Sequence, residues 1–115
     1  MFAPKPPRYE YHVRMVGETK VLCIVDLYDE NDPTLTVTNG AELVLAEIAR
    51  DLGELPETII YRDTDGVWDR MKAKPSGEFI GFMPIVKGLQ NRPAEENQAI
   101  QLAVTVLGGK TQRVQ

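Results

Sequence analysis

The alternation of apolar and polar positions near the start of the chain indicates two adjacent strands. Between residues 9 and 15, apolar residues alternate with Glu10, His12 and Arg14, which is the period of a half-buried strand. After a short turn, residues 21–27 form a nearly unbroken apolar run of strand-forming residues. We therefore predict a hairpin whose first strand lies nearer the edge of a sheet and whose second strand is covered on both sides.

The apolar spacing changes to that of a helix in two later segments. Asn39 is a good N-cap, and apolar residues then recur at the spacing of one helical face until Gly53 provides a left-handed stop. Pro93, which is followed by glutamates, favours the start of a second helix, and Gly108 and Gly109 end it. Each segment is therefore predicted as one amphipathic helix.

Three further strands are predicted between the helices. The stretch 59–71 is typical of two strands joined by a tight turn, and residues 78–85 form a third strand that Pro84 ends. The order strand, strand, helix, three strands, helix predicts an α+β domain with a five-stranded antiparallel sheet and two helices on one face. A sixth strand is added if residues 34–38 pair. This order resembles the connectivity of the profilin-like and longin/roadblock group, which implies a fold and no function.

Length and composition fit one folded domain. The 115 residues are 43% hydrophobic and 26% charged, which is close to globular averages and sufficient for one core. Three prolines among residues 1–8 predict a flexible, proline-rich arm, and residues 110–115 are expected to fray. We therefore expect a single α+β domain over residues 9–109.

Net charge and cysteine content narrow the choice of partner and compartment. A formal charge of −4 offers no general attraction to phosphate backbones, so nucleic acid is not expected as a partner. Cys23 is the single cysteine and cannot form an internal disulfide, which suits a reducing cytoplasm. No apolar run approaches the roughly 20 residues of a membrane span, and the N-terminus does not resemble a secretion signal. We expect a cytoplasmic protein that does not enter membranes.

The hairpin around Trp68, the only tryptophan, carries the densest mixed chemistry of the chain. Asp63 and Gly66 occupy the first and fourth positions of a type I turn, which favours a three-residue loop closed by a glycine bulge. In this register Arg62 faces Trp68 and its guanidinium would lie over the indole. A two-residue loop would instead place Arg62 opposite Asp69, so the loop type decides which side chains share a face.

The side chains of this hairpin favour binding over catalysis. Tyrosine, tryptophan and arginine are the residue types most enriched at interaction hot spots. We therefore predict a non-enzymatic protein-interaction or adaptor module that needs no cofactor and whose partner is another protein or a second copy in a homodimer. The predicted contact residues are Tyr61, Arg62, Trp68, Arg70 and Phe82. The alternative interpretation is that Trp68 is buried in the domain's own core.

Acidic residues support two alternative hypotheses. The first is a small-ligand-binding or metal-assisted enzyme that uses the carboxylates of Asp63, Asp65 and Asp69, although turn chemistry already accounts for the presence of two of these residues. A weaker metal set combines Asp29 and Asp32, from an acidic loop, with Asp63 and Asp65. A further hypothesis is a regulatory domain that binds a small molecule between sheet and helix.

His12 and Cys23 argue against nucleophilic catalysis and against zinc. His12 is the single histidine and is placed on the wet face of an early strand, whereas Cys23 lies in a strand that should be buried, where an inert thiol is expected. One cysteine and one histidine also cannot supply the usual ligands of a zinc site.

Overall fold

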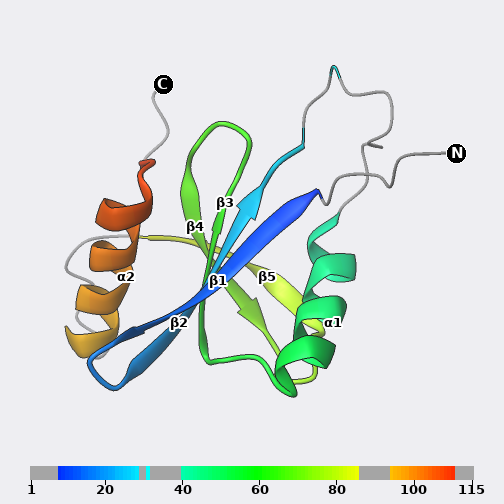
Figure 1. Cartoon of the computed structure of the whole chain (residues 1–115), viewed down its shortest axis with the longest axis horizontal. Helices are drawn as coiled ribbons and strands as arrows, with labels where there is room; N and C mark the ends of the chain where they lie inside the picture. The colour runs from blue at the N-terminus through cyan, green and yellow to red at the C-terminus, as the bar shows by residue number, and fades with distance from the viewer. Residues whose placement is uncertain (1–7, 29–30, 32–39, 86–93, 111–115) are drawn as a thin grey trace, which may run out of the picture.

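The computed structural model describes residues 8–28, 31, 40–85 and 94–110 of the chain. Within these ranges the elements follow in the order β1 (Tyr9–Val16), β2 (Thr19–Asp26), α1 (Gly40–Leu52), β3 (Thr58–Arg62), β4 (Trp68–Ala73), β5 (Phe79–Pro84) and α2 (Ala94–Leu107) (Figure 1). This order confirms the predicted α+β domain with a five-stranded sheet and two helices. The strand considered at residues 34–38 lies outside the described residues. No helix in the described ranges is both long and apolar enough to cross a membrane.

The sheet is mostly antiparallel, with one parallel pair that the sequence did not predict. The strands lie in the order β1-β2-β3-β4-β5, and only β2 and β3 run in the same direction. The connection between these two strands contains α1, so the chain crosses a face of the sheet before it pairs again. The expectation of antiparallel pairing was therefore wrong for β2 and β3.

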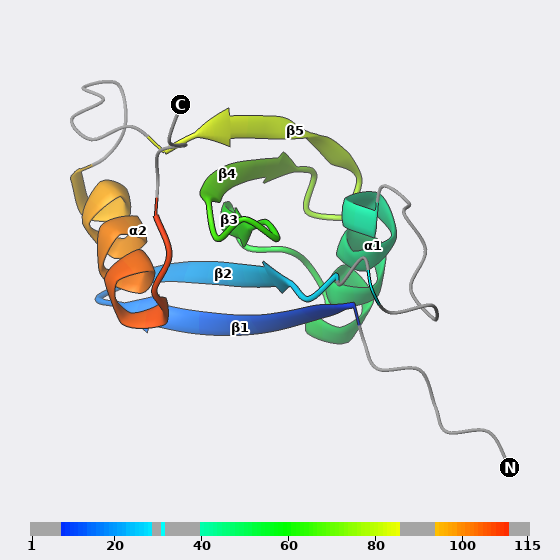
Figure 2. The ribbon, with the colours of Figure 1, turned by 90° about the horizontal axis from the view of Figure 1, so that it is seen from above.

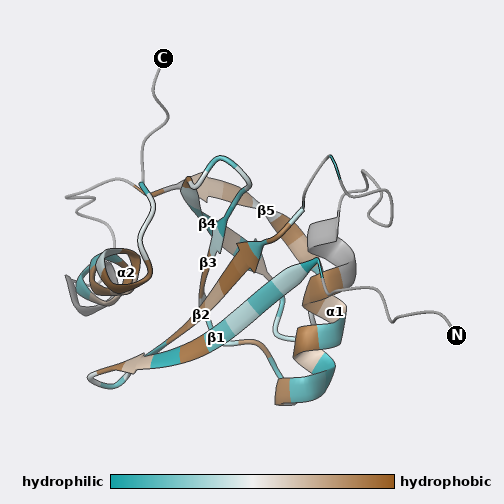
Figure 3. Cartoon of the chain, turned by 45° about the horizontal axis from the view of Figure 1, so that its top comes forward, coloured by the Kyte–Doolittle hydropathy of each residue, from teal (hydrophilic) through white to brown (hydrophobic). Residues whose placement is uncertain are grey.

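The two helices cover opposite faces of the sheet, as Figure 2 shows. Alternate residues of β2 enter two separate cores, since Cys23 packs with α2 and its neighbours Leu22 and Ile24 pack with α1. The expectation that both helices lie on one face was wrong. A strand that is apolar at nearly every position needs cover on both sides, and one helix on each face provides that cover. In Figure 3, β2 is mainly brown, the colour of hydrophobic residues, whereas β1 is of mixed colours.

Each helix contributes one apolar stripe to its core. From α1, Leu45, Ile48 and Ala49 are buried, and they pack on residues of β2, β3 and β4. From α2, the small residues Ala99 and Ala103 have no exposed surface, which allows the helix to approach the sheet closely. The apolar spacing predicts the buried side of α1, whereas in α2 Leu102 and Val106, which were expected on the apolar side, are exposed and Val104 is buried instead.

The β3–β4 hairpin has the predicted glycine-bulge register. Arg62 pairs with Trp68 across the two strands. The N–H of Gly66 donates to the carbonyl oxygen of Asp63 at 3.0 Å, and the N–H of Asp63 donates to the carbonyl oxygen of Val67 at 3.0 Å. The φ angle of Gly66 is 80°, a left-handed value that favours glycine at this turn position. This register confirms the three-residue loop and sets which hairpin side chains share a face.

Candidate functional site

The predicted contact residues are divided between the two faces of the sheet. Arg62 and Trp68 lie on the face that α2 covers, where Trp68 belongs to the same core as Ile60. Arg70 pairs with Ile60 and therefore occupies this face as well. Tyr61 and Phe82 lie on the α1 face, with their ring centroids 5.3 Å apart. The hairpin thus presents two surfaces with different surroundings.

Trp68 is a core residue that anchors the end of α2. Its side chain has no exposed surface, and its indole Nε1 donates a hydrogen bond to the carbonyl oxygen of Gly108 at 2.7 Å. The guanidinium carbon of Arg62 lies 5.7 Å from the ring centroid, and one terminal nitrogen of Arg62 donates to the carbonyl oxygen of Leu107 at 3.2 Å. The interpretation of Trp68 as a core residue is therefore the one that the geometry supports.

The chain beyond α2 is held tightly against this hairpin. The N–H of Trp68 donates to the carbonyl oxygen of Lys110 at 2.8 Å, and the N–H of Lys110 donates to the carbonyl oxygen of Gly66 at 2.9 Å. A Cβ atom on Gly109 would lie 2.7 Å from Nε1 of Trp68, so only glycine fits between them without a shift. Lys110, the first residue of the segment expected to fray, is thus bonded to the sheet, and residues 111–115 lie outside the described residues.

An aromatic row crosses the α1 face of the sheet. We use this name for Tyr9, Tyr61, Phe82 and Phe79, whose successive ring centroids are 6.2, 5.3 and 5.1 Å apart. In a regular strand, Phe79 and Phe82 would point to opposite faces because they are three positions apart. The register of β4 with β5 shifts by one residue between Lys72 and Ala73, which is the effect of a β-bulge. This bulge places both phenylalanine rings on one face.

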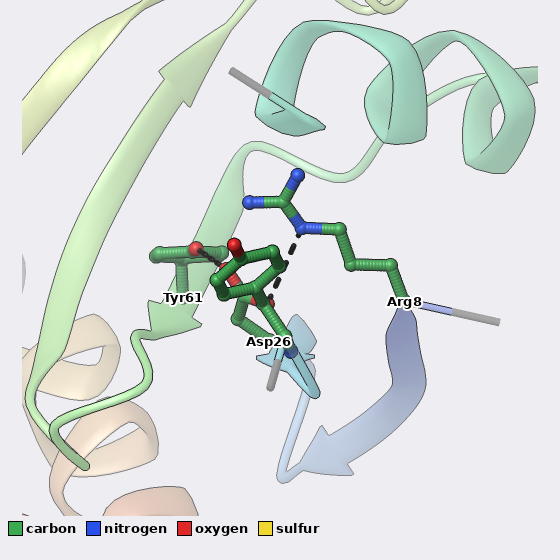
Figure 4. Close-up of polar contacts among 4 residues, drawn as sticks. Arg8, Asp26 and Tyr61 are labelled. Atoms are coloured by element: carbon green, nitrogen blue, oxygen red, sulfur yellow. Dashed lines mark hydrogen bonds and ion pairs between the residues drawn. The ribbon is translucent and has the colours of Figure 1, made fainter. Parts of the chain in front are cut away.

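A polar cluster adjoins the row at Asp26, the last residue of β2. The Tyr61 hydroxyl donates a short hydrogen bond of 2.5 Å to Asp26 Oδ2, and the N–H of Tyr28 donates to Oδ1 at 2.7 Å. Nε of Arg8 lies 3.6 Å from Oδ1, and the Asp26 side chain is only 5% exposed. Figure 4 shows Arg8 and Tyr61 converging on this carboxylate. We call Arg8, Asp26, Tyr28 and Tyr61 the Asp26 cluster.

Cation–π contacts surround Arg8, and burial keeps the tyrosine phenols of this region protonated. The guanidinium carbon of Arg8 lies 5.2 Å from the ring centroid of Tyr9 and 4.8 Å from that of Tyr28. Burial, the hydrogen bond to Asp26 and the Asp26 charge together raise the pKa of the Tyr61 phenol. Burial and Asp26 also raise the pKa of Tyr9. Both phenols therefore stay protonated at physiological pH, where they can donate hydrogen bonds but cannot serve as phenolate bases.

The Asp26 cluster was missed by the sequence analysis, although one signal for it exists. Asp26 was included in no candidate site, and Arg8 fell within the predicted flexible arm. An acid that directly follows a buried apolar strand is costly unless a cation or hydrogen-bond donors reach it, so its position predicts such partners. The sequence cannot identify those partners, because Tyr61 is 35 positions away. The cluster lies at the carboxyl ends of the parallel strands β2 and β3, where sheets of this kind often bind ligands.

Of the hairpin acids, Asp63 serves the turn through its carboxylate. Asp63 Oδ1 accepts the N–H groups of Asp65 at 2.9 Å and of Val67 at 3.0 Å. Across the described ranges, no group of three or more His, Cys, Asp or Glu side chains is placed to hold a metal ion. Asp29 and Asp32, named for the weaker metal set, lie outside the described residues.

Cys23 and a cavity beside the β1–β2 turn also lie apart from the aromatic row. Burial raises the pKa of the Cys23 thiol to about 11, so the thiolate nucleophile is scarce at neutral pH. A cavity of about 360 Å³ lies where the β1–β2 turn meets α2. It is lined by Val16, Gly17, Glu18, Thr19 and Gln98. None of the hairpin aspartates lines it, so it does not join them into a catalytic cleft.

Comparisons with protein-family models, with curated proteins and with solved structures found no match for this chain.

Proposed function

We propose that this protein is a non-enzymatic interaction module that binds a protein partner at Phe82, an exposed ring of the aromatic row. The observation that carries the proposal is the position of Phe82, whose side chain is 45% exposed while its ring packs between Tyr61 and Phe79. A ring that its neighbours already hold loses little rotamer freedom on binding, so a larger part of its burial contributes to affinity. We expect a partner that places an aliphatic or aromatic side chain on Phe82.

The chemistry around the row supports recognition rather than reaction. Tyr61 and Tyr9 remain protonated, and the Asp26 carboxylate is already engaged by two hydrogen bonds and an ion pair. Asp63 is committed to its turn. Trp68 and Arg62 support the proposal indirectly, since they hold the hairpin that carries Tyr61. We place this interaction in the cytoplasm, where a chain with a single unpaired cysteine is stable.

Site-specific photo-crosslinking in cells tests this proposal. A photoreactive amino acid in place of Phe82 should crosslink to a defined protein, whereas the same group in place of Leu102, an exposed apolar residue of α2, should not. The captured protein is then purified, and its binding is measured by calorimetry. Phe82→Ala should weaken the binding about thirtyfold, the effect of losing one aromatic hot spot of about 2 kcal/mol.

Two outcomes would count against the proposal. Crosslinks that are equally frequent at residues 82 and 102 would show that the surface is not selective. A captured partner that binds Phe82→Ala and Leu102→Ala with equal affinity would show that Phe82 is not the contact. Circular dichroism and thermal unfolding of both variants confirm that each remains folded, so that a loss of binding is not a loss of structure.

A further inference from the structure

Strand β1 is an open border of the sheet. It is the first strand in the sheet order, and within the described residues it pairs only with β2 (Figure 2). Its pairing with β2 is regular over all eight residues, and the strand contains no proline. The opposite border, β5, carries a bulge and ends in Pro84, two features that hinder further strand pairing. A long, regular border such as β1 is a template for another strand.

The hydrogen-bonding direction along β1 follows from its pairing. The N–H of Leu27 donates to the carbonyl oxygen of Arg8 at 2.6 Å, so the backbone of Arg8 is turned toward β2. In an antiparallel pair, successive residues turn their backbone groups alternately toward and away from the neighbouring strand. The even-numbered residues of β1 are therefore bonded to β2. The odd-numbered residues Tyr9, Tyr11, Val13 and Met15 direct their N–H and C=O groups toward the open side.

The side chains of β1 divide between an apolar and a charged row. The odd-numbered residues lie on the α1 face, where Val13 is 39% and Met15 is 59% exposed. The even-numbered residues occupy the other face and begin with Glu10, His12 and Arg14. In the described part of the chain, neither Glu10 nor Arg14 makes an ion pair. The strand thus carries exposed apolar surface and one unpaired charge of each sign.

We propose that β1 pairs antiparallel with β1 of a second copy of this chain, about a two-fold axis that passes at His12. In this register Glu10 of each copy faces Arg14 of the other, and His12 faces its own symmetry mate. On the other face, Tyr9 lies opposite Met15 and Tyr11 lies opposite Val13. Directly opposed residues of an antiparallel pair share a face, so the axis must pass at a single residue to keep the apolar row continuous.

Neighbouring registers are less favourable. An axis at Tyr11 would set Arg14 against Arg8 of the other copy, which opposes like charges. An axis at Val13 would leave Glu10 opposite an apolar residue, Val16. Only the axis at His12 forms two pairs of opposite charge, each expected to favour the complex, and also covers Met15. The outward backbone groups of the odd-numbered residues would then form about eight hydrogen bonds between the copies.

This contact joins two sheets into one and leaves Phe82, on β5, at the far border of each sheet. It does not depend on the binding proposed at Phe82, because β1 and β5 are opposite borders of the sheet. A dimer is therefore compatible with a separate partner at Phe82, and either proposal can fail without the other.

Cysteine placement tests the register in the full-length protein. A non-hydrogen-bonded antiparallel pair has its Cα atoms about 4.5 Å apart, which is within disulfide range. Under mild oxidation, His12→Cys should form a disulfide-linked dimer, whereas Glu10→Cys and Arg14→Cys should link far less because each faces the other position. Because Cys23 lies directly opposite residue 12 on β2 and could form an internal disulfide with a cysteine introduced there, all three variants are made in a Cys23→Ala background. Equal linking at all three positions, or none at residue 12, would overturn the proposal.

Charge exchange tests the dimer in solution by sedimentation velocity. Glu10→Arg and Arg14→Glu should each weaken dimerisation at least about tenfold, because each change converts both attractive pairs into repulsive ones. The double variant should restore the wild-type dimer, whereas Lys72→Glu, a reversal on exposed β4 surface, should have no effect. A wild-type chain that stays monomeric at about millimolar concentration would refute the proposal, as would a double variant that dimerises no better than the single variants.

Val13→Pro offers an independent check on edge pairing. The N–H of Val13 points away from β2, so proline at this border position removes a donor to the second copy without breaking a bond of the hairpin. We expect a folded monomer. A Val13→Pro protein that is folded and remains dimeric would contradict edge pairing, and if this variant does not fold, the charge exchange decides.

Discussion

The hydrogen bond between Tyr61 and Asp26 is expected to stabilise the fold measurably, and Tyr61→Phe removes it with almost no change in shape. The hydroxyl donates at 2.5 Å to a carboxylate that is 5% exposed. A hydrogen bond to a charged group contributes about 1.5–3 kcal/mol, and water has little access to replace this donor. We therefore expect Tyr61→Phe to lower the free energy of unfolding by about 1.5–3 kcal/mol, and the melting temperature by roughly 6–12 °C.

Urea denaturation followed by Trp68 fluorescence measures this effect, because Trp68 is the only tryptophan and is fully buried. A double-mutant cycle with Asp26→Asn then separates the pairwise interaction from other consequences of each change. We expect a coupling energy of about 1–2 kcal/mol between the two positions. Tyr11→Phe is the matched control: its hydroxyl donates to Asp51 at 3.1 Å on the exposed surface, and its removal should change stability little.

Additive effects of the two substitutions on the free energy of unfolding would refute the reasoning. If the effects of Tyr61→Phe and Asp26→Asn sum to that of the double variant within about 0.5 kcal/mol, the hydroxyl and the carboxylate do not interact energetically. The same conclusion would follow if Tyr61→Phe unfolded at the same urea concentration as Tyr11→Phe.

Three further predictions concern the core and the titrating groups. Trp68→Phe should destabilise the protein by about 2–4 kcal/mol in thermal unfolding, since it leaves a cavity and deprives the Gly108 carbonyl oxygen of its donor; a loss below about 1 kcal/mol would contradict this anchor. Above about pH 10, tyrosines ionise in the unfolded chain while Tyr61 stays protonated in the folded protein, so the free energy of unfolding should fall as pH rises. This fall should be shallower in Tyr61→Phe. Equal slopes for the two proteins would argue against the raised pKa of Tyr61. Cys23 should react with a thiol reagent at about pH 8 only after unfolding, because its thiol is buried and has a raised pKa; fast reaction of the folded protein would contradict this.

The element order and the β3–β4 loop could be predicted because both depend on residues close together in the sequence. Asp63 and Gly66 determine the hairpin loop through a hydrogen bond three residues apart and a left-handed glycine. The apolar spacing of α1 likewise predicted its buried side. Such local preferences are read directly from the order of residues, and the structure confirms them.

The candidate site could be predicted only in part. The sequence predicted a binding role for the aromatic residues Tyr61 and Phe82, but it could not show that their ring centroids lie 5.3 Å apart. That contact requires the pairing of three strands, and the bulge in β5 brings Phe79 onto the same face as Phe82. The binding role itself stays a prediction that the crosslinking experiment tests.

The sequence by itself predicted the elements and their order and favoured the observed hairpin register, because periodicity and turn chemistry act over a few residues. Tertiary structure alone decided that α1 and α2 cover opposite faces, that β2 and β3 run parallel, and that Asp26 receives Tyr61 and Arg8. These arrangements join residues far apart in the chain. Their selection depends on which combination buries the apolar surface on both sides of β2 and compensates the Asp26 charge at the same time.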